Sequence, residues 1–106
     1  MASRTNIQRT IISSSASGNV TIIANPSTTA RMYIWEMALV VGGAANLQFF
    51  DGAGAITGVL AMLANGSIFF PDDNPGNPRF VISPGQSFIV NDNTGVAKGG
   101  YVVYSN

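Results

Sequence analysis

The sequence of 106 residues contains no cysteine and no histidine, and only 9% of its residues are charged. Without cysteine no disulfide framework exists, so stability must come from packing and association. Without histidine, the usual base of Ser-His-Asp catalysis is missing. Five positive and five negative residues give a net charge of zero. They are scattered along the chain and do not form the basic cluster that phosphate binding requires, so we expect no nucleic-acid partner.

Long apolar runs are also missing. The longest, 32–41, is interrupted by Glu36 and is far shorter than the roughly 20 residues needed to cross a bilayer. The first six residues are polar and lack the apolar segment of a signal peptide, so we expect neither a leader nor a membrane partner.

What the chain does contain is apolar surface, because hydrophobic residues make up 46% of it. A domain of this size buries roughly two-thirds of the surface of its unfolded chain, and soluble domains usually carry about 25% charged residues to cover the rest. The few charges here predict a homo-oligomer with largely apolar contacts. The alternative is a neutral monomer wetted by its many Ser, Thr and Asn residues.

Short apolar segments alternate with turn residues along the chain, as is typical of all-β sandwiches and barrels. The strands are expected over residues 19–24, 31–41, 46–50, 56–64, 67–70, 79–82, 86–90 and 98–104. This pattern predicts an all-β fold, a jelly-roll-like antiparallel β-sandwich of about eight strands spanning residues 19–106. Residues 1–18 are expected to form an N-terminal arm that contains at most a short strand at 9–12.

The segment 31–41 is apolar on both faces, which predicts a strand covered on both sides. Strict alternation places Arg31, Tyr33, Trp35, Met37, Leu39 and Val41 together on one face. Glu36, on the other face, would be costly if unpaired, so we expect it to pair with Arg31 or Arg79, within or between subunits. The candidate subunit-interface residues are Tyr33, Trp35, Glu36 and Arg79.

Residues with catalytic or metal-binding potential are few. Lys98, the only lysine, could in principle activate a serine, but an exposed, solvated lysine is favoured. Asp72, Asp73 and Asn74 offer oxygen ligands for Ca²⁺, but their spacing is not that of a calcium loop, and a role in a turn is favoured. We therefore predict no catalytic residue, cofactor or metal site, and no enzyme.

Aromatic residues offer one further site. Tyr33 and Trp35, with Tyr101 or Tyr104, could form a platform for a sugar ring, although core or interface contacts are favoured for such side chains.

Several turn and strand segments together resemble those of small structural proteins of tailed bacteriophages, β-sandwiches that decorate capsids or form modules of virion fibres. The segments are Ile22-Ile23-Ala24 with Pro26, Arg31 to Ile34, Gly43 to Phe49, Ile56-Thr57-Gly58, Leu63-Ala64, Asn74-Pro75-Gly76, Ser83 to Val90, and Gly99 to Tyr104. They cover most of residues 19–106. Asn77-Pro78-Arg79-Phe80 departs from the Gly-Trp-Phe expected there.

The resemblance implies a trimeric capsid decoration, or cement, protein on the virion surface that binds the major capsid protein and stabilises the phage head. Within the arm, Arg4, Asn6, Ile7 and Arg9 are the expected capsid contacts. The alternative is an adhesion or carbohydrate-binding module of a phage tail or fibre.

Overall fold

The structure is a computed structural model that describes residues 7–25, 27–52, 54–72 and 77–105. The described residues form ten β-strands and no helix. The strands are β1 (Gln8–Ser14), β2 (Gly18–Ala24), β3 (Met32–Val41), β4 (Ala45–Asp51), β5 (Gly54–Ala55), β6 (Leu60–Met62), β7 (Ser67–Phe70), β8 (Phe80–Ile82), β9 (Ser87–Asp92) and β10 (Lys98–Ser105).

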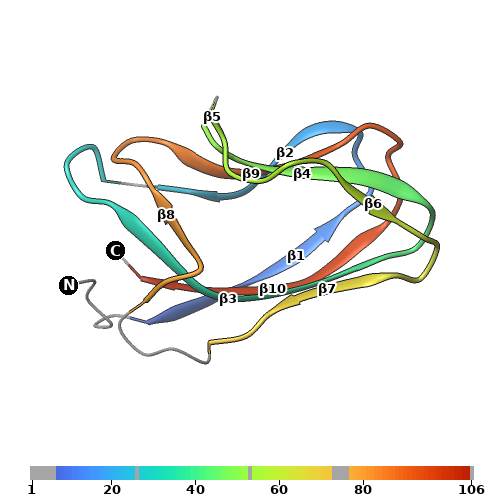
Figure 1. The fold of residues 1–106 in the computed structure, drawn as a ribbon. Coiled ribbons are helices and arrows are strands. Elements are labelled where there is room, and N and C mark those ends of the chain that lie inside the picture. Colours follow the sequence, from blue (N-terminus) through green and yellow to red (C-terminus); the bar gives the residue numbers. More distant parts are fainter. Residues whose placement is uncertain (1–6, 26, 53, 73–76, 106) are drawn as a thin grey trace.

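The strands form two antiparallel sheets that pack face to face (Figure 1). Sheet A has the order β1-β10-β3, with β7 and β8 both paired to the far edge of β3. Sheet B has the order β2-β9-β4, with β5 and β6 both paired to the far edge of β4. The pairing is nested in sequence: the first strand, β1, pairs with the last, β10, and the second, β2, pairs with the next to last, β9. This is the topology of a jelly roll. The predicted all-β sandwich is confirmed.

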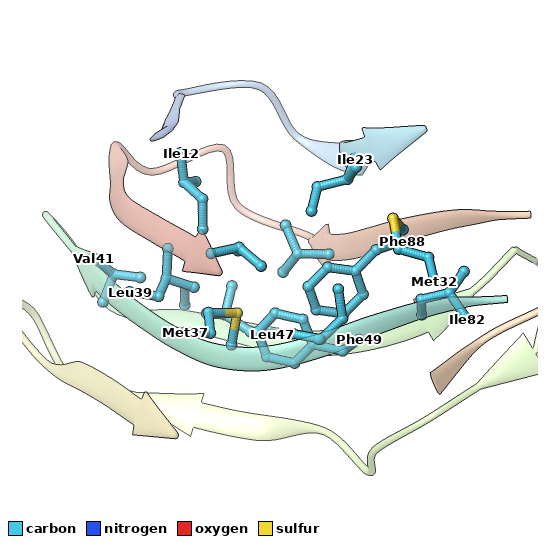
Figure 2. Packing of buried hydrophobic residues seen from close by; sticks show 14 residues of the cluster. Ile12, Ile23, Met32, Met37, Leu39, Val41, Leu47, Phe49, Ile82 and Phe88 are labelled. Carbon is cyan, nitrogen blue, oxygen red and sulfur yellow. The ribbon is translucent and has the colours of Figure 1, made fainter. Parts of the chain in front are cut away.

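The core lies between the two sheets, where apolar side chains of both layers interdigitate (Figure 2). Strand β3 contributes the largest share of it: Met32, Ile34, Met37, Leu39 and Val41, each completely buried. From sheet B, the rings of Phe49 and Phe88 stack with their centroids 5.7 Å apart. Aromatic pairs at such distances add to the stability that burial alone provides.

A β-bulge in β3 overturns the expected alternation of that strand. Tyr104 of β10 pairs with Ile34 and Val103 pairs with Glu36, so Trp35 is an extra residue without a direct partner on β10. The bulge moves the core-facing positions from even to odd numbers along β3. Trp35 is consequently not part of the core cluster that contains Met37, Leu39 and Val41.

The first strand corrects the expected limits of the N-terminal arm. β1 pairs with β10 over its whole length, from Gln8 opposite Tyr104 to Ser14 opposite Lys98, and Ile12 is buried in the core. Residues 8–14 are therefore an integral part of sheet A. Residues 1–6 lie outside the described residues.

The strand expected over residues 56–64 is interrupted. Leu60–Met62 is the only part of that range that is a strand, and the short strand Gly54–Ala55 precedes it. Between them, the hydroxyl of Thr57 accepts a hydrogen bond from the backbone N–H of Phe49 at 3.2 Å, and the side-chain amide of Gln48 donates to the Thr57 carbonyl at 2.9 Å. These side-chain bonds add to the backbone bonds that the N–H groups of Ile56 and Thr57 donate to the Phe49 carbonyl, at 2.8 and 3.4 Å.

Candidate functional site

The outer face of sheet A carries a continuous apolar row across four strands. Ile11 of β1 lies opposite Tyr101 of β10, Tyr101 opposite Ala38 of β3, and Ala38 opposite Phe69 of β7. Residues directly opposite one another on neighbouring strands share a face of the sheet. Ile11 and Phe69 are 68% and 58% exposed.

Val40 and Val103 extend this row on the same face, since each lies two positions along its strand from Ala38 or Tyr101. Val40 is 50% exposed. We call the set Ile11, Ala38, Val40, Phe69, Tyr101 and Val103 the apolar face.

The outer face of sheet B is different. Its central row consists of amides, with Asn19 of β2 opposite Asn91 of β9, and Asn91 opposite Gln48 of β4. The side-chain amide of Asn91 donates to the Asn19 side-chain oxygen at 2.8 Å. Ile89 and Phe50 on this face are half-buried, and none of the exposed large hydrophobic residues in the described ranges lies on β2, β9 or β4. The central strands of sheet B thus expose amides where those of sheet A expose apolar side chains, while the exposed Val59 and Leu63 flank β6 at the edge of sheet B.

A small polar cluster borders the apolar face. One carboxylate oxygen of Glu36 accepts a hydrogen bond from the Tyr101 hydroxyl at 2.7 Å, and the other accepts from the Asp72 backbone N–H at 3.3 Å. The guanidinium carbon of Arg9 lies 5.6 Å from the centre of the Tyr101 ring. The hydrogen bond to Glu36, followed by burial and the charge of Glu36, raises the pKa of Tyr101, and the charge of Arg9 partly offsets this.

Glu36 is therefore stabilised differently from what was predicted. Within the described part of the chain its hydrogen-bond partners are a hydroxyl and a backbone N–H, and neither Arg31 nor Arg79 pairs with it. The expected arginine pairing within a subunit is wrong. Pairing between subunits stays a prediction.

The other predicted interface residues lie at the bulge. Trp35 is completely buried within its own chain, and its indole N–H donates to the Ser105 hydroxyl at 2.8 Å. It is thus not accessible as a subunit contact. Tyr33, with its ring centre 6.1 Å from that of Trp35, and Arg79, whose backbone N–H donates to the Ile34 carbonyl at 2.7 Å, are both partly exposed.

The aromatic platform for a sugar ring is not formed. Trp35 is buried, whereas Tyr104 packs against the core and its hydroxyl donates to the Gln8 side chain at 3.0 Å. Tyr101 lies on the outer face, where its hydroxyl is bonded to Glu36. These side chains do not share one accessible surface.

A second polar cluster, which the sequence did not predict, is buried at the opposite end of the sandwich. Lys98 and Asp92 form an ion pair of 2.6 Å with both side chains excluded from solvent. The Lys98 ammonium also donates to the carbonyls of Val96 at 2.9 Å and Ala16 at 3.1 Å. The expectation of an exposed, solvated Lys98 is wrong, because the turn after β9 and the turn between β1 and β2 enclose it.

The Asp92 carboxylate is equally well bonded. One oxygen accepts from the backbone N–H and hydroxyl of Thr94 at 2.9 and 2.8 Å, and the other accepts from the Val96 N–H at 3.1 Å in addition to Lys98. Burial by itself raises the pKa of Asp92, but the bonds from Lys98 and Thr94 outweigh it and lower the pKa to about 2. The one signal in the sequence was Asp92 two residues before Thr94, a spacing typical of turns.

This ion pair is suited to holding the fold together rather than to catalysis. Each of the three ammonium protons of Lys98 has an acceptor, and the depressed pKa of Asp92 keeps its carboxylate ionised. A nucleophilic lysine would need to be neutral and accessible to a substrate.

The remaining candidates concern the arm and the proposed cation loop. Arg4, Asn6, Asp73 and Asn74 lie outside the described residues. Ile7 and Arg9 are exposed. The described ranges hold no group of three or more acidic or metal-ligating side chains that could bind a metal ion. They also hold no helix of the length and apolarity needed to cross a membrane.

Comparison with known proteins supports the fold. No protein-family model matches the sequence, and no curated protein matches it. Among solved structures, the chain is similar to one from Bacillus endospore appendages, described as a novel family of disulfide-linked pili. The TM-score is 0.54 at 12% sequence identity, and the similarity covers 92% of this chain and 82% of that chain. A likeness at this identity shows a shared β-sandwich fold.

Proposed function

We propose that this chain is a non-catalytic structural subunit that assembles with copies of itself. The observation that carries the proposal is the contrast between the two outer faces, one crossed by the apolar row and the other by amides. Covering Ile11, Val40 and Phe69, which are half exposed or more, contributes about 1 kcal/mol for each side chain. With so few charges in the chain, another copy is the cover that the composition favours.

Within this class we favour a decoration protein of a bacteriophage head. The support is the resemblance of the turns and strands between residues 19 and 106 to such virion proteins. A protein that binds the assembled shell and not its free subunits stabilises the shell by RT ln(1 + [L]/Kd), so it needs neither cofactor nor reaction. From the resemblance we expect a trimer. Its expected partner is the major capsid protein, and its expected location is the capsid surface.

A filament subunit is the second candidate. Its support is the similarity of this sandwich to a chain of the Bacillus endospore appendages. Those pili are described as disulfide-linked, and this chain has no cysteine. Contacts between its subunits would therefore be non-covalent. The tail-fibre adhesion module receives no comparable support, because the aromatic platform that suggested it is not formed.

Light scattering coupled to size-exclusion chromatography tests the proposal. The wild-type protein is expected to be an oligomer, and Phe69→Glu on the apolar face is expected to weaken it. Asn46→Glu, at a position on sheet B that is also exposed, is the matched control and should leave the mass unchanged. A wild-type protein that stays monomeric at millimolar concentration would contradict the proposed function.

A separate measurement distinguishes the two kinds of assembly. Quantitative mass spectrometry of purified virions should find hundreds of copies per particle for a head decoration protein. Electron microscopy of the concentrated protein should show regular fibres for a filament subunit.

A further inference from the structure

Strand β1 is a long edge strand that lacks the usual protection. Among the described residues, no strand pairs with the side of β1 that faces away from β10. β1 is seven residues long, pairs with β10 without a register shift, and contains neither proline nor glycine. Its one charged residue, Arg9, points to the outer face. Natural proteins usually shorten, bulge or charge such an edge, because its free N–H and C=O groups otherwise pair with another chain.

The other sheet edges carry these protections. β7 and β8 have four and three residues, and β5 and β6 have two and three. β2 matches β1 in length, but its pairing with β9 shifts register between Thr21 and Ile23, which marks a bulge. In the described part of the chain, β1 is therefore the one long and regular free edge. The edge that matches it best in length and regularity, and could pair with it, is β1 of a second copy.

We propose that two copies of this chain join their β1 edges in antiparallel fashion around a two-fold axis at Ile11. The inference rests on the proposed function and adds a second contact between copies, because joined edges extend the apolar face and do not cover Phe69 on the far strand β7. A two-fold contact joins copies in pairs and does not form the trimer that the resemblance predicts. A two-fold axis at the centre of the strand overlaps all seven residues of each copy. It creates a continuous sheet in which β1 of one subunit extends sheet A of its partner, a mode of binding in which the backbone provides the affinity.

The side chains fit this register. Ile11, 68% exposed in one copy, lies opposite the partner's Ile11, and such cross-strand apolar pairs are stabilising. Arg9 lies opposite the partner's Ser13, so no like charges meet across the joint. The apolar row of Phe69, Ala38, Tyr101 and Ile11 continues into the partner without a polar interruption.

Single cysteines test the contact directly, since the natural chain has none. Directly opposite residues have Cβ atoms about 4.5–5.5 Å apart, close to the span of a disulfide. Ile11→Cys under mild oxidation with diamide is therefore expected to give a covalent dimer in high yield. Ser13→Cys, on the same strand and face, is the matched control: its thiol would lie about 14 Å from the partner's equivalent, so it should remain uncross-linked.

Charge at Ser13 provides a second test. Ser13→Glu should tighten association and Ser13→Lys should weaken it, each by about two- to tenfold in the dissociation constant. In the proposed register residue 13 lies opposite the partner's Arg9 at two symmetric positions, so a glutamate there is attracted and a lysine is repelled. In an Arg9→Gln background this difference should disappear. Within one chain Arg9 and Ser13 are four residues apart on an extended strand, too far for direct contact.

The outcomes separate the inference from the proposed function. An oligomeric wild-type protein whose Ile11→Cys variant does not cross-link overturns the β1 contact and leaves the proposed function standing. The two-fold register is overturned if Ser13→Cys cross-links more readily than Ile11→Cys. It is also overturned if Ile11→Cys forms a covalent dimer only when it is mixed with Phe69→Cys. A monomeric wild-type protein overturns the proposed function itself.

Discussion

The ammonium nitrogen of Lys98 lies 2.6 Å from a carboxylate oxygen of Asp92, and both side chains are excluded from solvent. The pair joins the end of β9 to the start of β10 and, through the carbonyl of Ala16, to the turn between β1 and β2. How much such a buried pair contributes to the free energy of unfolding depends on how completely each charge is hydrogen-bonded, because both charges have been removed from water. Here every ammonium proton and both carboxylate oxygens have partners.

Removing either charge should therefore be costly. Lys98→Met leaves the Asp92 carboxylate buried without its counter-ion, and we expect a loss of about 3–5 kcal/mol in the free energy of unfolding. Urea unfolding monitored by circular dichroism measures the loss. In the double variant Asp92→Leu/Lys98→Met no charge remains buried, so it should be more stable than Lys98→Met alone. Equal or lower stability of the double variant would contradict this account.

The same pair predicts how stability depends on pH. The pKa of Asp92 is lowered to about 2 in the folded protein from an ordinary value of 3.8. Its contribution is complete above about pH 5 and is lost as the pH falls through 3.8 towards 2, because the unfolded chain takes up the proton first. The difference in unfolding free energy between the wild type and Asp92→Asn should shrink over this interval. A difference that stays constant from pH 5 to pH 2 would show that Asp92 is not the group responsible.

Two adjacent glycines of β10 should respond differently to alanine. A Cβ atom on Gly100 would collide with the backbone carbonyl of Ala38 on the central strand β3, and its φ of +156° already disfavours a side chain. A Cβ on Gly99 would meet only the Ile12 carbonyl oxygen, at an ordinary 3.8 Å. Gly100→Ala is expected to lower the free energy of unfolding by about 1–3 kcal/mol. Gly99→Ala is the control and should change it by less than about 1 kcal/mol.

The hydrogen bond between Tyr101 and Glu36 can be detected by titration. Because this bond raises the pKa of Tyr101, the residue should lose its proton at a higher pH than an ordinary tyrosine. Glu36→Gln should bring the pKa back towards its usual value. Ultraviolet absorbance of tyrosinate follows the titration, and Tyr101→Phe identifies which of the three tyrosines is responsible. An identical titration curve in Glu36→Gln would rule out the bond.

The local parts of the fold were predictable because they depend on neighbouring residues. The Asn65-Gly66 turn indicated a hairpin, and Asn65 does adopt the left-handed conformation, with a φ of +61°. The strand 67–70 begins and ends where the sequence indicated. Most other strands were placed within one or two residues of their observed limits.

The candidate interface was less predictable, because its residues come from distant parts of the chain. Ile11, Tyr101, Ala38 and Phe69 belong to four strands that become neighbours only through pairing. Alternation along β3 also failed at Trp35, since one inserted residue exchanges the two faces and nothing in the local sequence marks it. Lys98 is buried because turns separated by some 80 residues enclose it.

The sequence alone determined that this protein is built of short antiparallel strands with few charges, because turn chemistry and side-chain period act over a few residues. Only the tertiary structure decided which face of each strand is covered and which edge is left open. The reason is physical: β1 and β10 are far apart in the sequence and become neighbours only by pairing, and exposure is a property of the paired sheets and not of any single strand.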